Sequence, residues 1–187
     1  ISKNSKLQEI LNTLLRNRGI KTAQQKKEFF NPKHPERIKN KELGIREGEL
    51  KKAVKRIKEA IKNKEKVIIY GDYDVDGICA AAIMWETLHA LGADAMPYIP
   101  SRFTEGYGLN IESIKKLKEE DEKLGLIITV DHGIVAHEKV NFAKELGIDV
   151  IIVDHHESLA TKPKACAIVH TQKISGSGVA WALARSL

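Results

Sequence analysis

The sequence predicts an α/β protein, in which a parallel β-sheet is flanked by helices and preceded by a small helical N-terminal region. After Lys66, short apolar runs such as VIIYG, LIITV and VIIVD alternate four times with helical segments. These runs are continuously apolar, which is typical of strands covered on both faces of a parallel sheet. Before Lys66, apolar residues instead recur every three or four positions, as they do in amphipathic helices.

The first third of the chain is expected to be helical. The predicted helices lie at residues 5–17, 22–30 and 47–63. Thr22 is the expected N-cap of the second helix, and Pro32 and Pro35 interrupt regular structure after it. We therefore expect a helical N-terminal region at residues 1–46 and a sheet domain at residues 47–187. The sheet domain is expected to be truncated at its C-terminal end, because the chain stops within a helical pattern.

Strands and helices are expected to alternate through the rest of the chain. The predicted strands lie at residues 67–71, 94–99, 126–130 and 150–154. The predicted helices between them lie at residues 77–91, 111–124 and 136–146. In such a sheet, ligands bind outside the carboxyl ends of the strands, so the residues that follow each strand are the first place to look for a site.

The net charge of +6 conceals an asymmetry along the chain. Residues 1–66 contain 20 Lys and Arg against 8 Asp and Glu, a balance of +12. Residues 67–187 contain 11 against 17, a balance of −6. This pattern suggests a polyanionic partner held near a cation-binding centre. The alternative is that the lysine-rich helices are simply solvated surfaces.

The composition predicts a cytoplasmic protein without a membrane span. The sequence has no apolar run of the length that crosses a bilayer and no visible secretory signal. Its two cysteines, Cys79 and Cys166, do not suggest a disulfide framework, which fits a reducing compartment.

Acidic side chains and histidines follow three of the predicted strands. The first strand is followed by DYDVD, the third by Asp131-His132 and the fourth by Asp154-His155-His156. Because the carboxyl ends of parallel strands meet at one edge, these side chains are expected to converge. The converging residues are Asp72, Asp74, Asp76, Asp131, Asp154, His155 and His156.

Carboxylates and imidazoles without thiolates suit hard or borderline cations such as Mn²⁺ and Mg²⁺. Two such ions, bridged by a carboxylate, activate water and neutralise a phosphoryl oxygen. Alternate residues of an extended segment point the same way, so the D-x-D-x-D spacing directs its carboxylates to one centre. We infer metal-assisted hydrolysis of a phosphoester or phosphoanhydride. The plainer alternative is that the aspartates serve as turn and N-cap residues.

The loop after the second predicted strand, SRFTEGYGL, offers two candidates for binding a nucleic acid. The guanidinium group of Arg102 is suited to a phosphate, and the ring of Tyr107 is suited to stacking on an unpaired base. The alternative is a structural loop packed on the sheet edge. Two interpretations of His132 stay open, namely a role beside the site and an ordinary place in a loop.

Together, the motifs DYDVDG, TVDHG and VDHHE resemble those of the DHH phosphoesterase superfamily. With IPSRFTEGYGL and SGSGVAWALA, the chain resembles the single-stranded-DNA-specific 5′→3′ exonucleases of that superfamily. The resemblance implies two divalent metal ions, Mn²⁺ or Mg²⁺, and single-stranded DNA as substrate in repair and recombination. A helicase or a single-strand-binding protein is a candidate partner, and the oligomeric state stays open.

The resemblance also implies roles for the converging side chains. Asp74, Asp76 and His155 would bind metal, Asp131 would bridge the two ions, and Asp72 would be a ligand or lie close behind. His156 would contact the scissile phosphate, Asp154 would orient the histidines, and Arg102 would lie along the DNA path.

The chain departs from the family pattern at His132, where Cys or Asn is usual, and it ends before a later metal-binding aspartate of the family. Three functions therefore stay in view. The first is a metal-dependent exonuclease, the second a phosphoesterase of short oligonucleotides or cyclic dinucleotides, and the third a non-catalytic, nuclease-like binding subunit.

Overall fold

A computed structural model describes residues 3–187, and the chain divides into two compact units, Ile1–Lys39 and Asn40–Leu187. The first unit contains helices α1 (Lys3–Asn17) and α2 (Ala23–Phe30) and the 3-10 helix η1 (Pro35–Arg37). Thr22 caps α2 as expected, because its hydroxyl accepts from the backbone of Gln25 while the Gln25 side chain accepts from the backbone of Thr22.

The division between the units lies nearer the N-terminus than the boundary expected between residues 46 and 47. The segment from Asn40 to Arg46 packs with the sheet domain. Leu43 and Ile45 are buried, and the Thr171 hydroxyl donates a hydrogen bond to the Leu43 carbonyl at 2.6 Å. These long-range contacts are not visible in the local composition of the segment.

The second unit alternates helices and strands. Its helices are α3 (Glu47–Asn63), α4 (Val75–Ala90), α5 (Ile111–Glu120), α6 (His137–Glu145) and α7 (Gly176–Ala184). Its strands are β1 (Lys66–Tyr70), β2 (Asp94–Tyr98), β3 (Leu124–Val130), β4 (Asp149–Asp154) and β5 (Ala167–His170). All paired strands are parallel, and their order is β2-β1-β3-β4-β5. The predicted α/β class, with a parallel sheet flanked by helices, is confirmed.

The order of the strands reverses between β1 and β3. The chain passes from β1 to β2 on one side, then returns to β3 on the other side of β1. The carboxyl ends of β1 and β3 are therefore neighbours from which the connections diverge. A crevice at such a switch point is where open parallel sheets bind ligands.

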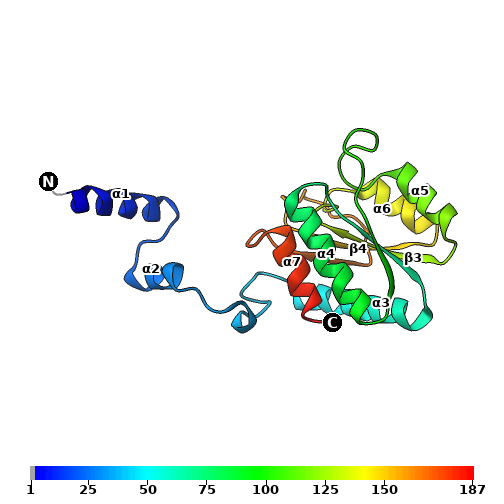
Figure 1. Cartoon of the computed structure of the whole chain (residues 1–187), viewed down its shortest axis with the longest axis horizontal. Coiled ribbons are helices and arrows are strands. Elements are labelled where there is room, and N and C mark those ends of the chain that lie inside the picture. Colours follow the sequence, from blue (N-terminus) through cyan, green and yellow to red (C-terminus); the bar gives the residue numbers. More distant parts are fainter. Residues whose placement is uncertain (1–2) are drawn as a thin grey trace. The chain divides into compact units, whose positions relative to one another are not determined.

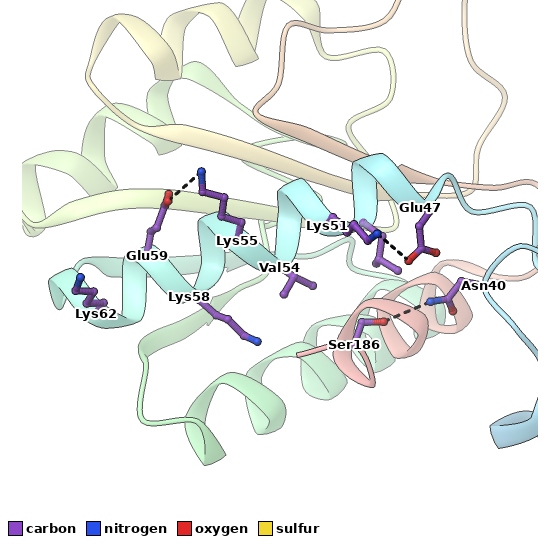
Figure 2. Close-up of a pocket in the computed structure, with 10 residues that line it drawn as sticks. Asn40, Glu47, Lys51, Val54, Lys55, Lys58, Glu59, Lys62 and Ser186 are labelled. Carbon is purple, nitrogen blue, oxygen red and sulfur yellow. Dashed lines mark hydrogen bonds and ion pairs between the residues drawn. The ribbon is translucent and has the colours of Figure 1, made fainter.

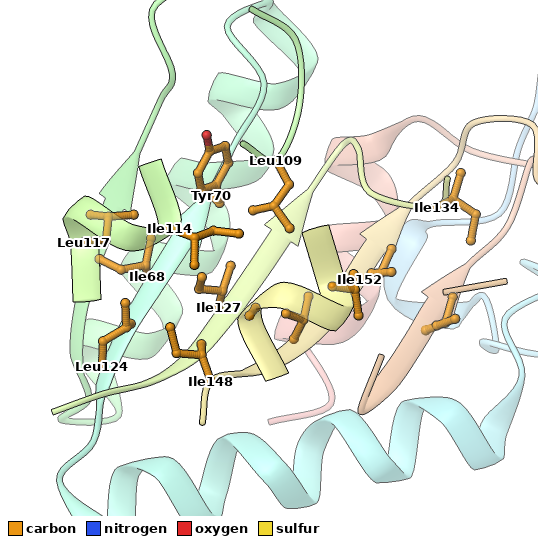
Figure 3. Packing of buried hydrophobic residues seen from close by; sticks show 14 residues of the cluster. Ile68, Tyr70, Leu109, Ile114, Leu117, Leu124, Ile127, Ile134, Ile148 and Ile152 are labelled. Carbon is orange, nitrogen blue, oxygen red and sulfur yellow. The ribbon is translucent and has the colours of Figure 1, made fainter. Parts of the chain in front are cut away.

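Helices cover both faces of the sheet. On one face, Ile68, Tyr70 and Ile127 pack with Ile114 of α5 and Val140 of α6 (Figure 3). The alternate strand residues point to the other face, where α4 and α7 contact the sheet and each other. This two-sided burial explains why the strand sequences are continuously apolar.

Two local predictions were wrong. The helix expected at residues 111–124 ends at Glu120, because Leu124 is buried in β3, where it pairs with Lys66. The four-residue strand β5 was not expected, since AIVH is short and bordered by polar turns. Its place is set by pairing with β4.

No helix within residues 3–187 combines the length and apolar character needed to cross a membrane.

Replacement of Ile127 by alanine tests the two-sided core. The side chain is fully buried, so Ile127→Ala should lower the free energy of unfolding by about 2–5 kcal/mol. Met96, half exposed on the edge strand β2, is a control at which alanine should cost less than about 1 kcal/mol. Urea unfolding monitored by circular dichroism measures both, and equal losses would contradict this description of the core.

Candidate metal centre

The predicted site residues lie at the carboxyl edge of the sheet, around the switch point. Strand register brings the loops together, since Tyr70 is level with Thr129, and Val130 is level with Val153. The Asp131 amide extends the ladder by donating to the Val153 carbonyl at 2.9 Å. Asp131 is therefore level with Asp154 on the neighbouring strand.

The loop after β1 presents the first carboxylates. Asp72 is buried and its Oδ1 accepts from the Tyr73 amide at 2.7 Å. Burial raises the pKa of Asp72, and the nearby charge of Asp74 raises it further. Asp74 is the N-cap of α4, because its Oδ1 accepts from the Asp76 and Gly77 amides. The plainer reading of this aspartate as a cap is thus also correct, and it leaves Oδ2 for another partner.

Asp76 holds the N-terminus of α7. Its Oδ2 accepts from the Gly176 amide at 2.7 Å, and its Oδ1 accepts from the Ser177 amide at 2.8 Å. Burial alone would raise the pKa of Asp76, but the hydrogen bonds from Ser177 and Gly176 outweigh it, so the pKa lies below its ordinary value. An anion at a helix N-terminus is favourable because the amides there lack partners within the helix.

Asp131 is the most constrained carboxylate of the group. It is 1% exposed and its backbone has a φ of 65°, a left-handed conformation that is uncommon outside glycine. Burial and the charges of Asp76 and Asp74 raise its pKa to about 7. Its Oδ1 has no hydrogen-bond partner among residues 3–187, although it lies 3.1 Å from His155 Nε2. The two atoms approach each other without hydrogen-bond geometry.

Asp154 orients the neighbouring histidines. Its Oδ1 accepts from the His155 and His156 amides and lies 2.8 Å from His156 Nδ1, while its Oδ2 accepts from the Ile134 amide. Burial alone would raise the pKa of Asp154, but these hydrogen bonds outweigh it and lower the pKa. Asp154 is therefore held as an anion, and the ring of His156 is turned so that its other nitrogen, Nε2, is free.

Two groups of side chains bring possible ligand atoms within 4.8 Å of one another. One consists of Asp131, His155 and His156, and the other of Asp72, Asp74 and Asp131. Asp131 is common to both, as a bridging ligand would be. Asp76 is in neither group, although its Oδ2 lies 3.7 Å from His155 Nε2.

These residues fit divalent cations. Asp131 Oδ1 is buried 3.1 Å from an imidazole nitrogen without a hydrogen bond between them, and the charges of further carboxylates lie nearby. A cation would satisfy this orphaned oxygen and offset the repulsion. The donor set of carboxylate oxygens and imidazole nitrogens suits Mn²⁺ or Mg²⁺.

His132 is an interior residue beside the site. It is fully buried, its Nε2 lies 2.9 Å from the Tyr70 carbonyl, and burial lowers its pKa to about 4. The ring is therefore neutral, with Nε2 as the donor. It packs edge-on against Tyr70 and Tyr107 and supports the switch point from inside.

Arg102 and Tyr107 lie at the same edge, in the loop between β2 and α5. The ring of Tyr107 is 6.5 Å from the ring of His156 and 6.4 Å from that of Tyr73. The Arg102 guanidinium lies over the Tyr73 ring at 5.3 Å. The structure thus brings both predicted residues to the carboxylate cluster, through a tyrosine that lies between Asp72 and Asp74.

Tyr73, Gly176 and Ser177 were not singled out from the sequence. Tyr73 lies inside the DYDVD motif, where the aspartates on either side are the stronger indication of a site. Gly176 is required for a close approach, since a Cβ there would collide with Asp131 Oδ1. The repeated small residues of SGSG were the available signal for a helix start packed against the site.

A separate groove runs along α3 and does not coincide with this edge (Figure 2). It has a volume of about 610 Å³ and is lined by lysines of α3 with Leu50, Val54 and Ser186. Within the described chain, its lining includes none of the predicted site residues. The chemistry of the site is set by the carboxylate cluster, and the size of the groove does not bear on it.

Comparison with known proteins gives a consistent result. The family model described as DHH family, N-terminal domain, matches residues 66–186. The single-stranded-DNA-specific exonuclease RecJ of Bacillus subtilis is 42% identical over 184 residues, which cover 94% of this chain and 23% of that protein. The chain thus spans about a quarter of the length of this relative.

Solved structures show the same likeness. A crystal structure of exonuclease RecJ bound to manganese has a TM-score of 0.65 and 37% identity, covering 72% of this chain and 36% of that one. RecJ from Thermus thermophilus in complex with Mn²⁺ has a TM-score of 0.65 and 29% identity, covering 91% of this chain and 23% of that one.

Asp131→Asn tests the like-charge crowding. Because the pKa of Asp131 is raised by folding, its carboxyl contributes stability at low pH that is lost as pH rises through about 7. In chelator at about pH 8, Asp131→Asn should raise the melting temperature by several degrees, and this gain should shrink toward about pH 5. Saturating Mn²⁺ should reverse the order of the two melting temperatures, because only the unsubstituted chain is expected to bind the ion tightly. Differential scanning fluorimetry measures these melting temperatures. If Asp131→Asn did not raise the melting temperature in chelator, the proposed repulsion between the carboxylates would be refuted.

Gly176→Ala tests the contact between α7 and Asp131. The added methyl group would collide with the Asp131 carboxylate, so Mn²⁺ affinity measured by calorimetry should fall by more than about tenfold. Gly178→Ala is a matched control in the same turn, where the new methyl group would meet only the Ile174 side chain. Equal affinities in the two variants would show that the close approach is unimportant.

Proposed function

The chain belongs to the DHH family, and from that premise we propose that its protein is a metal-dependent, single-stranded-DNA-specific 5′→3′ exonuclease. The observation that carries the proposal is the orphaned Asp131 Oδ1, which faces His155 Nε2 at the centre of two overlapping groups of ligands. The relatives named single-stranded-DNA-specific exonuclease RecJ support the choice of substrate. The polarity of digestion is proposed from the resemblance of the motifs. The chain covers only part of their length, so the activity is proposed for the whole protein.

The proposed site takes two divalent ions, Mn²⁺ or Mg²⁺. Asp131 would bridge them, with His155 and Asp76 on one side and Asp72 and Asp74 on the other. The overlap of the two groups at Asp131 and the 3.7 Å approach of His155 to Asp76 support this arrangement. Bound there, the ions supply positive charge for the phosphodiester and lower the pKa of an attacking water.

The surrounding residues would position the strand. His156 is held by Asp154 through Nδ1, so its Nε2 is available to a phosphate oxygen. Burial alone would lower the pKa of His156, but Asp154 and further carboxylates outweigh it, so the ring keeps its positive charge to a higher pH than usual. Arg102 would contact a backbone phosphate, and Tyr107 would stack on a base.

Other features remain predictions. Single-stranded DNA is the proposed partner, with a helicase or a single-strand-binding protein as a further candidate and a cytoplasmic location. A role in DNA repair and recombination follows from the likeness to RecJ.

The experiment compares hydrolysis of 5′-labelled single-stranded and double-stranded DNA in Mn²⁺ by a RecJ-length protein that contains this chain. Asp74→Asn keeps the cap of α4, since asparagine is an equally good N-cap, but it removes a proposed ligand charge. Label should be released from the single strand alone, and Asp74→Asn should reduce the rate by at least about a hundredfold.

Asp94→Asn provides a matched control. This aspartate begins β2, at the amino ends of the strands and away from the carboxylate cluster, and it forms an ion pair with Lys66. It should leave the rate unchanged. Faster turnover of dinucleotides or cyclic dinucleotides than of long strands would favour the short-substrate hydrolase. Tight Mn²⁺ binding without hydrolysis of any of these substrates, in this chain and in a RecJ-length protein alike, would favour a binding subunit.

A further inference from the structure

Phe103 is the most exposed large apolar side chain in the described part of the molecule. It is 96% exposed and lies in the loop between β2 and α5, the green loop that projects from the sheet in Figure 1. A phenylalanine ring left in water forgoes the favourable free energy of its burial. A single exposed apolar residue is ordinary, so the position and surroundings of the ring decide what it does.

The loop that carries Phe103 is anchored on both sides. Glu105 accepts hydrogen bonds from the Tyr98 hydroxyl, from the Ser101 amide at 2.8 Å and from the Ser113 hydroxyl at 2.5 Å. Its carbonyl accepts from the Asn110 side chain at 3.0 Å. The loop therefore has a defined conformation, and the ring is exposed because the loop presents it outward.

The residues beside Phe103 lead to the metal centre. Arg102, its neighbour in the chain, stacks its guanidinium over Tyr73, and Tyr73 lies between two of the proposed metal-binding aspartates. Tyr107, also half exposed, meets Tyr73 edge-on. The guanidinium of Arg102 and the rings of Tyr73 and Tyr107 thus connect the residue beside Phe103 with the loop that carries the carboxylates.

We propose that Phe103 is a stacking residue for an unpaired nucleobase of the strand approaching the metal centre. The proposal rests on the proposed function and extends its DNA path by one ring beyond Tyr107. A flat ring beside a guanidinium fits a base and its phosphate, because every base offers a π-face and the phosphate pairs with the cation. A protein partner would instead require a contiguous apolar patch around the ring.

This assignment also bears on strand selectivity. In a duplex both faces of each internal base are covered by its neighbours, so an external ring gains nothing from it. An unpaired base is free to stack, so Phe103 would favour the binding of single strands over duplexes as the DNA approaches the metal centre.

The test measures binding to a RecJ-length protein that contains this chain by fluorescence anisotropy, with Ca²⁺ in place of Mn²⁺ so that the strand is not consumed. Phe103→Ala should weaken the binding of a labelled thymidine oligomer by about five- to a hundredfold. It should not change the affinity for an oligomer of the same length whose sugars carry no bases. Phe103→Trp should restore the binding, since it keeps a stacking face.

Leu159→Ala is the control for loss of an exposed apolar side chain, and its affinities should equal those of the native chain. Moving a single abasic site along the strand should reveal one position at which Phe103→Ala has no further effect. Equal losses on the base-containing and base-free oligomers would overturn the proposal, as would unchanged affinity. Failure of the unsubstituted RecJ-length protein to bind any strand would instead contradict the proposed function itself, and this inference with it.

Discussion

The structure depends on the mutual repulsion of carboxylates gathered at one edge of a parallel sheet. Asp131 is buried and has Asp74 and Asp76 as charged neighbours, which makes its ionised form costly. The cost is met in three ways. The α7 amides bind Asp76, the α4 amides bind one oxygen of Asp74, and protonation or a bound cation would relieve Asp131. Among the buried carboxylate oxygens of the described chain, Asp131 Oδ1 is the one left without a hydrogen-bond partner.

The surroundings divide the acidic residues by role. Asp154 receives four hydrogen-bonding contacts and is stabilised as an anion, so it serves as a fixed support for the histidines. Asp131 receives none at Oδ1 and is destabilised as an anion, so it is suited to a bound cation. Residues of one chemical type thus divide between support and binding according to the donors that their backbone neighbours supply.

The sequence predicted the convergence of the site well, because it follows from topology. Strands that are apolar throughout are typical of buried parallel sheets, and the carboxyl ends of parallel strands meet at one edge. The partners of individual side chains were not predictable in the same way. Nothing local to Asp76 indicates that it meets Gly176, because that contact depends on how α7 packs against α4. The short strand β5 and the early end of α5 escaped prediction for the same reason, since both are set by pairing with a neighbouring strand.

The bond between Asp76 and α7 also has a consequence for the order of synthesis. Asp76 and its donors are separated by 100 and 101 residues, so the first loop of the site leaves the ribosome long before the amides that neutralise it. Until α7 docks, Asp76 lacks the two amides that stabilise its carboxylate, although Asp74 can already cap α4. Assembly of the carboxylate cluster is therefore deferred until the segment that forms α7 has been synthesised and docked.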